Sequence, residues 1–216
     1  MQRETIDDSD WKFKIPSGMI ISGPSNSGKT QFLIRLMENA AQLFSPEPKA
    51  ILYCYGEYHS FIPGLENRGI KICSGMPTEE QLDQLPRPHL LVLDDLMLTA
   101  SEKTLSELFT KKAHHRNFGI IFVTQNLFER VLRVARNNSQ YIVLMRAPNA
   151  VLQIRNLGSQ LFPGKLDYFL DSYRQATEQP YGYLVLDLHA GSLPILRIRT
   201  NIFPDNEPTI FVPTKF

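Results

Sequence analysis

The feature that most constrains this chain is a glycine-rich segment that lies between an apolar run and an amphipathic stretch. The segment satisfies the pattern G-x-x-x-x-G-K-[ST]. Its residues are Gly23, Pro24, Ser25, Asn26, Ser27, Gly28, Lys29 and Thr30. A strand that enters such a loop and a helix that leaves it turn backbone N–H groups inward, where they bind phosphate oxygens. The segment therefore predicts a phosphate-binding loop (P-loop), in which Lys29 reaches the terminal phosphates and Thr30 ligates Mg²⁺.

Short apolar runs recur along the chain, and most are bounded by glycine, proline or polar residues. They predict strands at 19–22, 50–55, 70–73, 90–93, 120–124, 141–145, 183–188 and 195–199. Amphipathic stretches between them predict four helices: 29–44, one that begins near Thr99 with Glu102 completing a capping box, 127–135 and 165–176. This alternation is typical of an α/β fold with a central, mostly parallel sheet that is flanked by helices.

Length and composition favour one domain. With 216 residues, 43% of them hydrophobic and 21% charged, the chain can bury its own core. We expect a single domain over residues 1–200 and an extended tail at 201–216, where three prolines fall close together. The net charge of +1 argues against a passive coat for nucleic acid, so contact with DNA would use local basic patches.

The cysteines and the apolar runs bear on the compartment. Cys54 and Cys73 are the only cysteines; they lack metal-ligand spacing and are expected to be reduced core residues. No apolar run reaches the roughly 18 residues of a membrane span, and residues 1–14 do not read as a secretory signal. We therefore expect an intracellular protein without membrane contact.

Two acidic residues follow the apolar run 90–93. This run predicts a buried strand beside the strand of the P-loop, with Asp94 and Asp95 at its carboxyl end, where ligands bind in such sheets. Asp94 would hold the Mg²⁺ shell and Asp95 would polarise the attacking water. Asp95 is shorter than the glutamate usual in that role. The plainer alternative is an acidic helix N-cap after a core strand.

Two more polar residues follow predicted strands. Gln125, after the run 120–124, can donate a hydrogen bond to a γ-phosphate and accept one from a water. A polar turn between strand and helix would also account for it. Glu57 follows the run 50–55 and could face a nucleotide or DNA, although the tyrosines around it are most simply explained by strand packing.

A P-loop by itself indicates nucleotide binding and not a particular reaction. The chain has no N-K-x-D guanine reader and no L-S-G-G-Q run, which disfavours a GTPase and a transporter-type ATPase. A P-loop kinase of a nucleoside or another small molecule stays open. So does an assembly factor that is gated by ATP and turns over poorly.

Four segments together resemble a known family. They are GPSNSGKT at 23–30, ILYCYGE at 51–57, LLVLDD at 90–95 and HHRNFGIIFVTQNLF at 114–128. In this combination the chain resembles the viral genome-packaging ATPases of the poxvirus and Maverick/Polinton type, within the FtsK/HerA superfamily of ring-shaped DNA pumps. The resemblance covers about residues 11–161, and the segment 114–128 is its most specific part.

The resemblance implies a RecA/ASCE-like P-loop fold and ATP-driven translocation of double-stranded DNA into a preformed capsid. It implies a homo-oligomeric ring with ATP and Mg²⁺ between subunits, contact with a capsid protein, and action in the host nucleus, a cytoplasmic virus factory or the virion. Lys29 and Thr30 match the family's phosphate and metal positions. Asp94 and Asp95 match its acidic pair, and Gln125 matches its sensor glutamine.

Such rings also use an arginine that reaches into the site from the neighbouring subunit. Arg116 is the first candidate, ahead of Arg136 and Arg155, and an ordinary solvated arginine at a helix end is the alternative. Basic residues also gather in two groups that could contact DNA phosphates or simply form solvated helix faces. These groups are Lys111, Lys112, His114, His115 and Arg116, and Arg130, Arg133 and Arg136.

Overall fold

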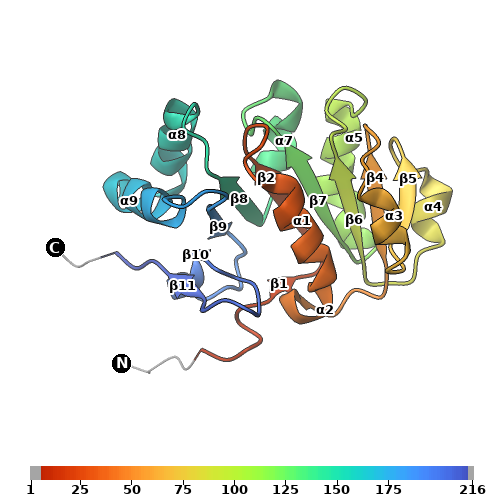
Figure 1. The fold of residues 1–216 in the computed structure, drawn as a ribbon, viewed down its shortest axis with the longest axis horizontal. Coiled ribbons are helices and arrows are strands. Elements are labelled where there is room, and N and C mark those ends of the chain that lie inside the picture. The colour runs from red at the N-terminus through yellow and green to blue at the C-terminus, as the bar shows by residue number, and fades with distance from the viewer. Residues whose placement is uncertain (1–5, 214–216) are drawn as a thin grey trace.

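A central sheet runs through the structure, with helices on both of its faces (Figure 1). The computed structural model describes residues 6–213, and within them the sheet has nine strands in the order β11-β10-β9-β8-β2-β7-β6-β4-β5. Their bounds are β2 (Ser17–Ser22), β4 (Ile51–Tyr55), β5 (Lys71–Ser74), β6 (His89–Asp94), β7 (Phe118–Thr124), β8 (Tyr141–Met145), β9 (Tyr183–Asp187), β10 (Ile198–Thr200) and β11 (Thr209–Ile210). The short strands β1 (Phe13–Lys14) and β3 (Phe44–Ser45) pair with each other in parallel, apart from this sheet.

The strands from β8 to β5 in this order are parallel, and β9, β10 and β11 extend the sheet with antiparallel pairings. The α/β class and the mostly parallel sheet are thereby confirmed. Each predicted apolar run contains a strand. The last strand begins later than predicted, at Ile198, because a 3₁₀ turn that starts with Pro194 takes up the first part of the run.

The acidic strand is not beside the P-loop strand, so that prediction was wrong. β7 pairs with β2 through Met19↔Ile121 and with β6 through Val92↔Ile121, and therefore lies between them. β7 is buried along its whole length, which suits the centre of a sheet covered on both faces. Because of this strand order, the carboxyl end of β7, which Gln125 follows, lies between the P-loop and the acidic pair.

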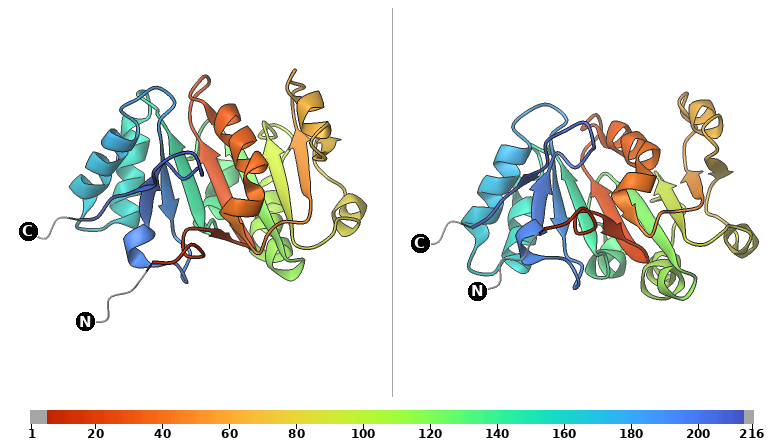
Figure 2. Two further views of the ribbon diagram at one scale, coloured as in Figure 1. Left: turned by 60° about the horizontal axis from the view of Figure 1, so that its bottom comes forward. Right: turned by 90° about the horizontal axis from the view of Figure 1, so that it is seen from below.

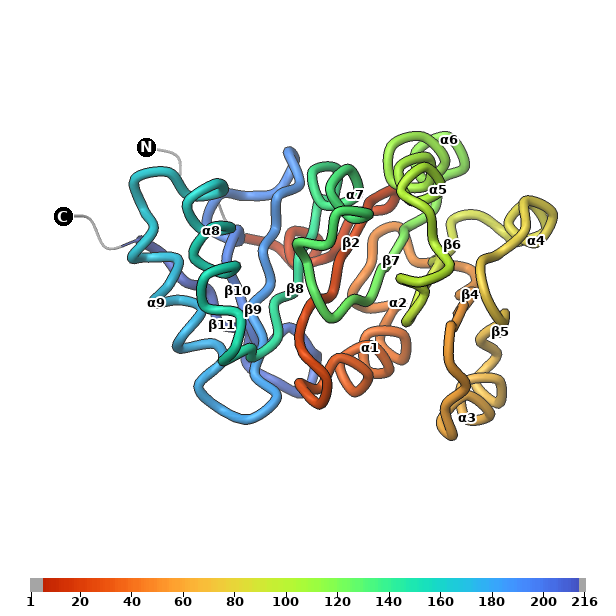
Figure 3. The backbone as a smooth tube through the Cα atoms, turned by 90° about the horizontal axis from the view of Figure 1, so that it is seen from above, coloured from red at the N-terminus to blue at the C-terminus, as the bar shows by residue number. Residues whose placement is uncertain are grey.

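The helices fall on two sides of the sheet (Figure 3), and two apolar clusters fill the space beneath them. One side holds α1 (Lys29–Glu38), α2 (Ala40–Leu43) and α3 (Ile62–Glu66). The other holds α4 (Glu79–Asp83), α5 (Glu102–Glu107), α6 (Ala113–His115), α7 (Arg133–Asn137), α8 (Val151–Leu161) and α9 (Leu166–Ala176). Side chains alternate along each strand, so Val92 packs under α1 while Leu91 and Leu93 pack on the opposite side.

Helix boundaries differ from the predictions in three places. The stretch 29–44 forms α1 and α2, separated at Asn39. The second helix begins at Glu102, and the hydroxyl of Ser101 caps it by accepting from the N–H of Thr104. The hydroxyl of Thr99 donates to the carbonyl of Leu96 instead, so the capping box predicted at Thr99 was wrong. In the stretch 127–135, a 3₁₀ turn (Arg130–Leu132) comes first and the helix α7 begins only at Arg133.

The segment 201–213 turns at residues 203–206, is otherwise without helix, and lies against the domain (Figure 2). Phe203 is buried, β11 pairs with β10, and the hydroxyl of Tyr168 on α9 donates a 2.6 Å hydrogen bond to the carbonyl of Phe211. Cys54 and Cys73 are buried and unbonded, opposite each other on β4 and β5. In the part of the chain that the structure describes, no helix has the length and apolar character to cross a membrane.

Candidate nucleotide-binding site

The P-loop joins the carboxyl end of β2 to the first turn of α1. Gly28 has φ 95°, a left-handed conformation that glycine adopts without strain. The N–H of Gly23 donates a 3.2 Å hydrogen bond to the carbonyl of Thr124, which fixes the start of the loop to β7. Ser27 is buried, whereas Ser25 and Asn26 line the cleft in front of the loop. The amino end of α1 therefore opens into that cleft, where an anion is favoured.

Lys29 is held across the loop. Its Nζ donates hydrogen bonds of 2.7 Å and 2.8 Å to the carbonyl oxygens of Gly23 and Pro24. Partial burial lowers the pKa of Lys29, and the nearby carboxylates of Asp94 and Asp95 oppose that shift. The lysine thus places a positive charge in the same cleft as the two acids.

Asp94 ends β6 and is buried, with 8% of its surface exposed. The hydroxyl of Tyr53, on the neighbouring strand β4, donates a 2.7 Å hydrogen bond to its Oδ2. Burial raises the pKa of Asp94, while the hydrogen bond from Tyr53 favours the ionised form and opposes the rise. Tyr53 therefore helps to keep the carboxylate charged in a desolvated position.

Asp95 is exposed and has φ 53°, a left-handed conformation that is uncommon for a residue with a side chain. The loop after β4 passes directly over it. The N–H of Gly56 donates to the carbonyl of Asp94, and a Cβ on Gly56 would lie only 2.0 Å from the carbonyl oxygen of Asp95. Glycine at position 56 is thus what allows the two loops to meet, and the meeting fixes the backbone of the acidic pair.

A cleft of about 690 Å³ opens where these elements converge, and Lys29, Thr30, Asp94, Asp95 and Gln125 all line it. The five residues predicted from separate motifs are therefore brought together. Gln125 also contacts the P-loop, because its Oε1 accepts a 3.3 Å hydrogen bond from the hydroxyl of Ser25. A hydroxyl from Thr30 and a carboxylate from Asp94 fit Mg²⁺, which binds proteins through few oxygen ligands and takes others from phosphates and water.

Three further ionisable side chains line the cleft: Glu57, His59 and Glu129. Glu57, which the sequence analysis expected to face either a nucleotide or DNA, lines this cleft. His59 and Glu129 were missed. Glu129 is placed by a turn in which Asn126 accepts from the N–H of Phe128 and donates a 3.0 Å hydrogen bond to the Glu129 carboxylate. An asparagine after the strand with a glutamate three residues later was the signal for this turn.

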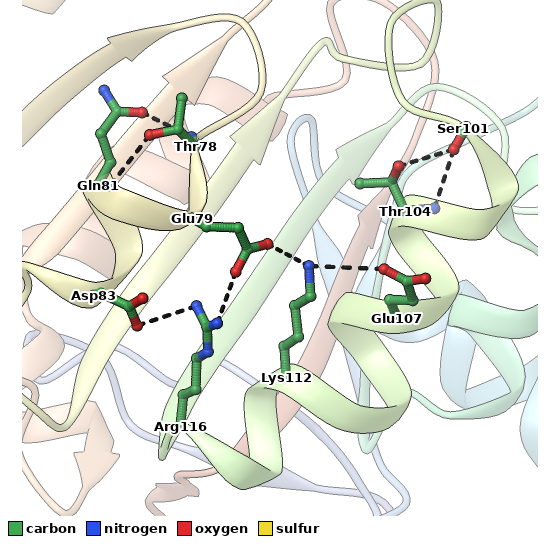
Figure 4. A network of polar contacts seen from close by, with 9 residues as sticks. All are labelled: Thr78, Glu79, Gln81, Asp83, Ser101, Thr104, Glu107, Lys112 and Arg116. Carbon is green, nitrogen blue, oxygen red and sulfur yellow. Dashed lines mark hydrogen bonds and ion pairs between the residues drawn. The ribbon is translucent and has the colours of Figure 1, made fainter.

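Arg116 lies just before β7, at the opposite end of that strand from Gln125, and is not in this chain's cleft. It forms ion pairs with Glu79 (2.7 Å) and Asp83 (3.3 Å) on α4, and Lys112 pairs with Glu79 (2.5 Å), as Figure 4 shows. These pairs tie α4 to the helical segment before β7. An arginine finger would act in the site of the neighbouring subunit, so the role of Arg116 as such a finger stays a prediction.

The other two arginine candidates lie elsewhere. Arg136 donates to the carbonyl of Leu127 and stacks over the ring of Phe128, 4.7 Å from its centroid. Arg155 is exposed on α8. Neither lines the cleft that holds the P-loop.

The strand order and the site are those of a P-loop NTPase fold: a parallel sheet in which one strand separates the P-loop strand from the acidic strand, with the phosphate loop, lysine and acidic pair at its carboxyl edge. Similarity to solved structures agrees with this fold. No protein-family model matches the chain, and no curated protein matches its sequence.

Among solved structures, the chain is similar to the genome packaging NTPase B204 from Sulfolobus turreted icosahedral virus 2 in complex with ATP-gammaS. The TM-score is 0.53 at 12% identity, over 93% of this chain and 98% of that one. The DNA-packaging ATPase B204 from Sulfolobus turreted icosahedral virus gives a TM-score of 0.52 at 14% identity, again over 93% and 98%. At these identities the likeness is one of fold.

Proposed function

We propose that this chain is an ATPase that translocates double-stranded DNA and packages a viral genome. The observation that carries the proposal is the single cleft in which the P-loop, a buried carboxylate and Gln125 converge. The fold likeness to packaging NTPases over nearly the full length of both chains supports the same conclusion. The closer placement beside the poxvirus and Maverick/Polinton enzymes rests on the sequence resemblance.

The chemistry assigned to the site is hydrolysis of the γ-phosphate. Loop N–H groups and Lys29 hold the phosphates, and Thr30 and Asp94 are the residues that would hold Mg²⁺, which neutralises charge on the β- and γ-phosphates when bound. Asp95 orients a water in line with the bond to the β-phosphate oxygen. The water oxygen bonds to the γ-phosphorus as the bond from that phosphorus to the β–γ bridging oxygen breaks; the water's proton passes to the Asp95 carboxylate and from there to solvent, giving ADP and phosphate. Gln125 stabilises the γ-phosphate from the side of β7.

DNA contact is assigned to phosphate backbones without sequence reading. Arg130, on the 3₁₀ turn after the cleft residues, and Arg133, the first residue of α7, are both exposed and are the residues to which we assign this contact. We further propose a homo-oligomeric ring in which a neighbour's arginine completes the site, a capsid contact, and action in the host nucleus, a cytoplasmic virus factory or the virion.

The test is ATP hydrolysis by the purified protein with and without long double-stranded DNA. Strong stimulation by DNA that weakens with added salt, and that is lost in Lys29→Ala, supports the proposal. Lys71→Ala, an exposed lysine on β5, is the matched control and keeps wild-type turnover. Turnover indifferent to DNA, with phosphate passed to a small acceptor, would identify a kinase instead. ATP binding with negligible turnover would identify a gated assembly factor.

A further inference from the structure

A second pocket, of about 730 Å³, lies on the other side of the P-loop. Gly28 and the first residues of α1 form one wall, and aromatic residues from β9 and the C-terminal segment form the rest. This pocket and the cleft that holds the acidic pair share Asn26, Lys29 and Thr30 among their lining residues. The two spaces therefore adjoin at the P-loop, and one is acidic and polar while the other is aromatic.

Tyr181 lies at the rim of this second pocket, on the turn between α9 and β9. A Cβ built on Gly28 would lie 3.0 Å from Cβ and Cδ1 of Tyr181, so the tyrosine packs directly on the P-loop. Nevertheless 66% of the residue is exposed, and its φ of 62° is strained for a side chain of this size. Strained residues that the fold holds in place gather at functional sites.

The turn around Tyr181 is fixed on both sides. The N–H of Arg146 donates a 3.0 Å hydrogen bond to the carbonyl of Gly182, and its guanidinium donates another of 3.0 Å to the carbonyl of Glu178. A Cβ on Gly182 would lie 2.6 Å from the carbonyl oxygen of Ala176, so only glycine lets the chain turn back this closely. The tyrosine ring is thus presented by a rigid support.

The floor of the pocket is aromatic. The ring centroids of Phe32 and Tyr183 are 4.7 Å apart, and those of Phe32 and Phe203 are 5.3 Å apart. Arg35 stacks over Phe203 and forms a 2.5 Å ion pair with Asp205, which holds the C-terminal segment against α1. The segment 201–206 is therefore a wall of the pocket.

We propose that this second pocket holds the base of a nucleoside triphosphate and that Tyr181 is the residue on which the base stacks. The inference rests on the proposed function, because it takes the phosphates to lie in the P-loop. The acidic cleft accommodates the γ-phosphate and its water, so the base extends to the opposite side of the loop. There it meets an exposed aromatic face, which stacks on a base without needing to read its edge.

The experiment compares MgATP with inorganic tripolyphosphate, which carries the same phosphate chain and no base. Calorimetric titration gives both affinities for wild type, Tyr181→Ala, Tyr181→Phe and Tyr181→Gly. The glycine variant removes the ring and also relieves the backbone strain. We expect the alanine and glycine variants to bind ATP at least tenfold more weakly and tripolyphosphate within twofold of wild type, and the phenylalanine variant to bind both normally.

Steady-state kinetics give a second readout. Loss of stacking raises the KM for ATP in Tyr181→Ala and leaves kcat unchanged, because the phosphates still react in the same place. Tyr58→Ala is the matched control, since Tyr58 is equally exposed and lines neither pocket. Its ATP affinity stays at the wild-type value.

Three results overturn the inference. Wild-type ATP affinity in Tyr181→Ala and Tyr181→Gly removes the base site and leaves the proposed ATPase standing. A parallel loss of ATP and tripolyphosphate affinity shows that Tyr181 acts only by supporting the P-loop. A wild-type chain that binds no ATP overturns the proposed function, and the base site with it.

Discussion

The hydroxyl of Tyr53 donates a 2.7 Å hydrogen bond to the carboxylate of Asp94, across the β4–β6 pair of the sheet. Asp94 is the buried member of the acidic pair, and burial works against its charge. A hydrogen bond to the ionised form offsets part of that penalty. The aromatic strand β4 therefore supports the carboxylate that we propose holds Mg²⁺, as well as packing in the core.

Removal of this hydroxyl changes the pH dependence of hydrolysis. In Tyr53→Phe the carboxylate of Asp94 loses a donor, so protonation becomes easier and its pKa rises further. Since Mg²⁺ binds the ionised form, the acidic limb of kcat/KM against pH moves to higher pH. Tyr55→Phe, on the same strand, leaves the limb in place. An acidic limb that stays put in Tyr53→Phe contradicts this role.

The backbone of the acidic pair depends on Gly56. Gly56→Ala places a methyl group against the carbonyl of Asp95, and one of the two loops has to move. We expect a loss of about 2 kcal/mol or more in unfolding free energy, together with at least a tenfold fall in kcat. Thermal unfolding and steady-state hydrolysis measure both effects. Gly64→Ala, on α3 with no atom within 4 Å of the new Cβ, is the control and lowers neither quantity.

We expect Gln125 to act on the terminal phosphate and not on nucleotide affinity. In Gln125→Ala we expect kcat to fall on the order of 10²-fold, a loss typical of a removed hydrogen-bond donor to developing charge. The dissociation constant for ATP stays within about threefold of wild type, because Lys29 and the loop still hold the phosphates. Gln160→Ala, exposed on α8, behaves as wild type. A large loss of ATP affinity in Gln125→Ala would place the glutamine in ground-state binding instead.

Acid stability depends on His89. Its side chain is fully buried at the start of β6 and stacks on Phe118, with ring centroids 5.0 Å apart. Burial lowers the pKa of His89 to about 4, against about 6.5 in an unfolded chain. The unfolded chain therefore binds the extra proton between these values, and up to about 3 kcal/mol of stability is lost as the pH falls from 6.5 to 4.

Urea unfolding at pH 7.5 and pH 5 measures this contribution. His89→Leu loses less stability between the two pH values than wild type does. His115→Leu, an exposed histidine on α6, keeps the wild-type difference. An unchanged pH dependence in His89→Leu would show that His89 is not the group that titrates.

Sequence patterns located the residues that line this cleft because such patterns are local. The P-loop, Asp94 and Gln125 each follow a short apolar run, and parallel strands bring their carboxyl ends to one edge. The order of strands in the sheet depends on contacts between residues far apart in the sequence. Because β6 and β7 are similarly apolar, their sequences did not indicate that β7, and not β6, lies next to β2. Tyr181 was missed for a similar reason, since a tyrosine in a turn becomes notable only when Gly28, far away in sequence, is found beneath it.

The helices show the same limit at shorter range. Amphipathic periodicity located α9 and α1, but the N-cap predicted at Thr99 was wrong, because the hydroxyl of Thr99 donates to the carbonyl of Leu96 and the hydroxyl of Ser101 is the one that caps. Arg116 was predicted from its place next to the sensor strand. Its partners Glu79 and Asp83 lie more than thirty residues away, beyond the reach of any local pattern.

Translocation is the central claim, and displacement of a triplex-forming oligonucleotide from linear double-stranded DNA tests it most directly. A motor that moves along DNA strips the third strand when ATP is added. We predict displacement that requires ATP hydrolysis, is absent in Lys29→Ala and is unaffected in Lys71→Ala. Rapid ATP hydrolysis in the presence of the same DNA, with the third strand left in place, would contradict the account.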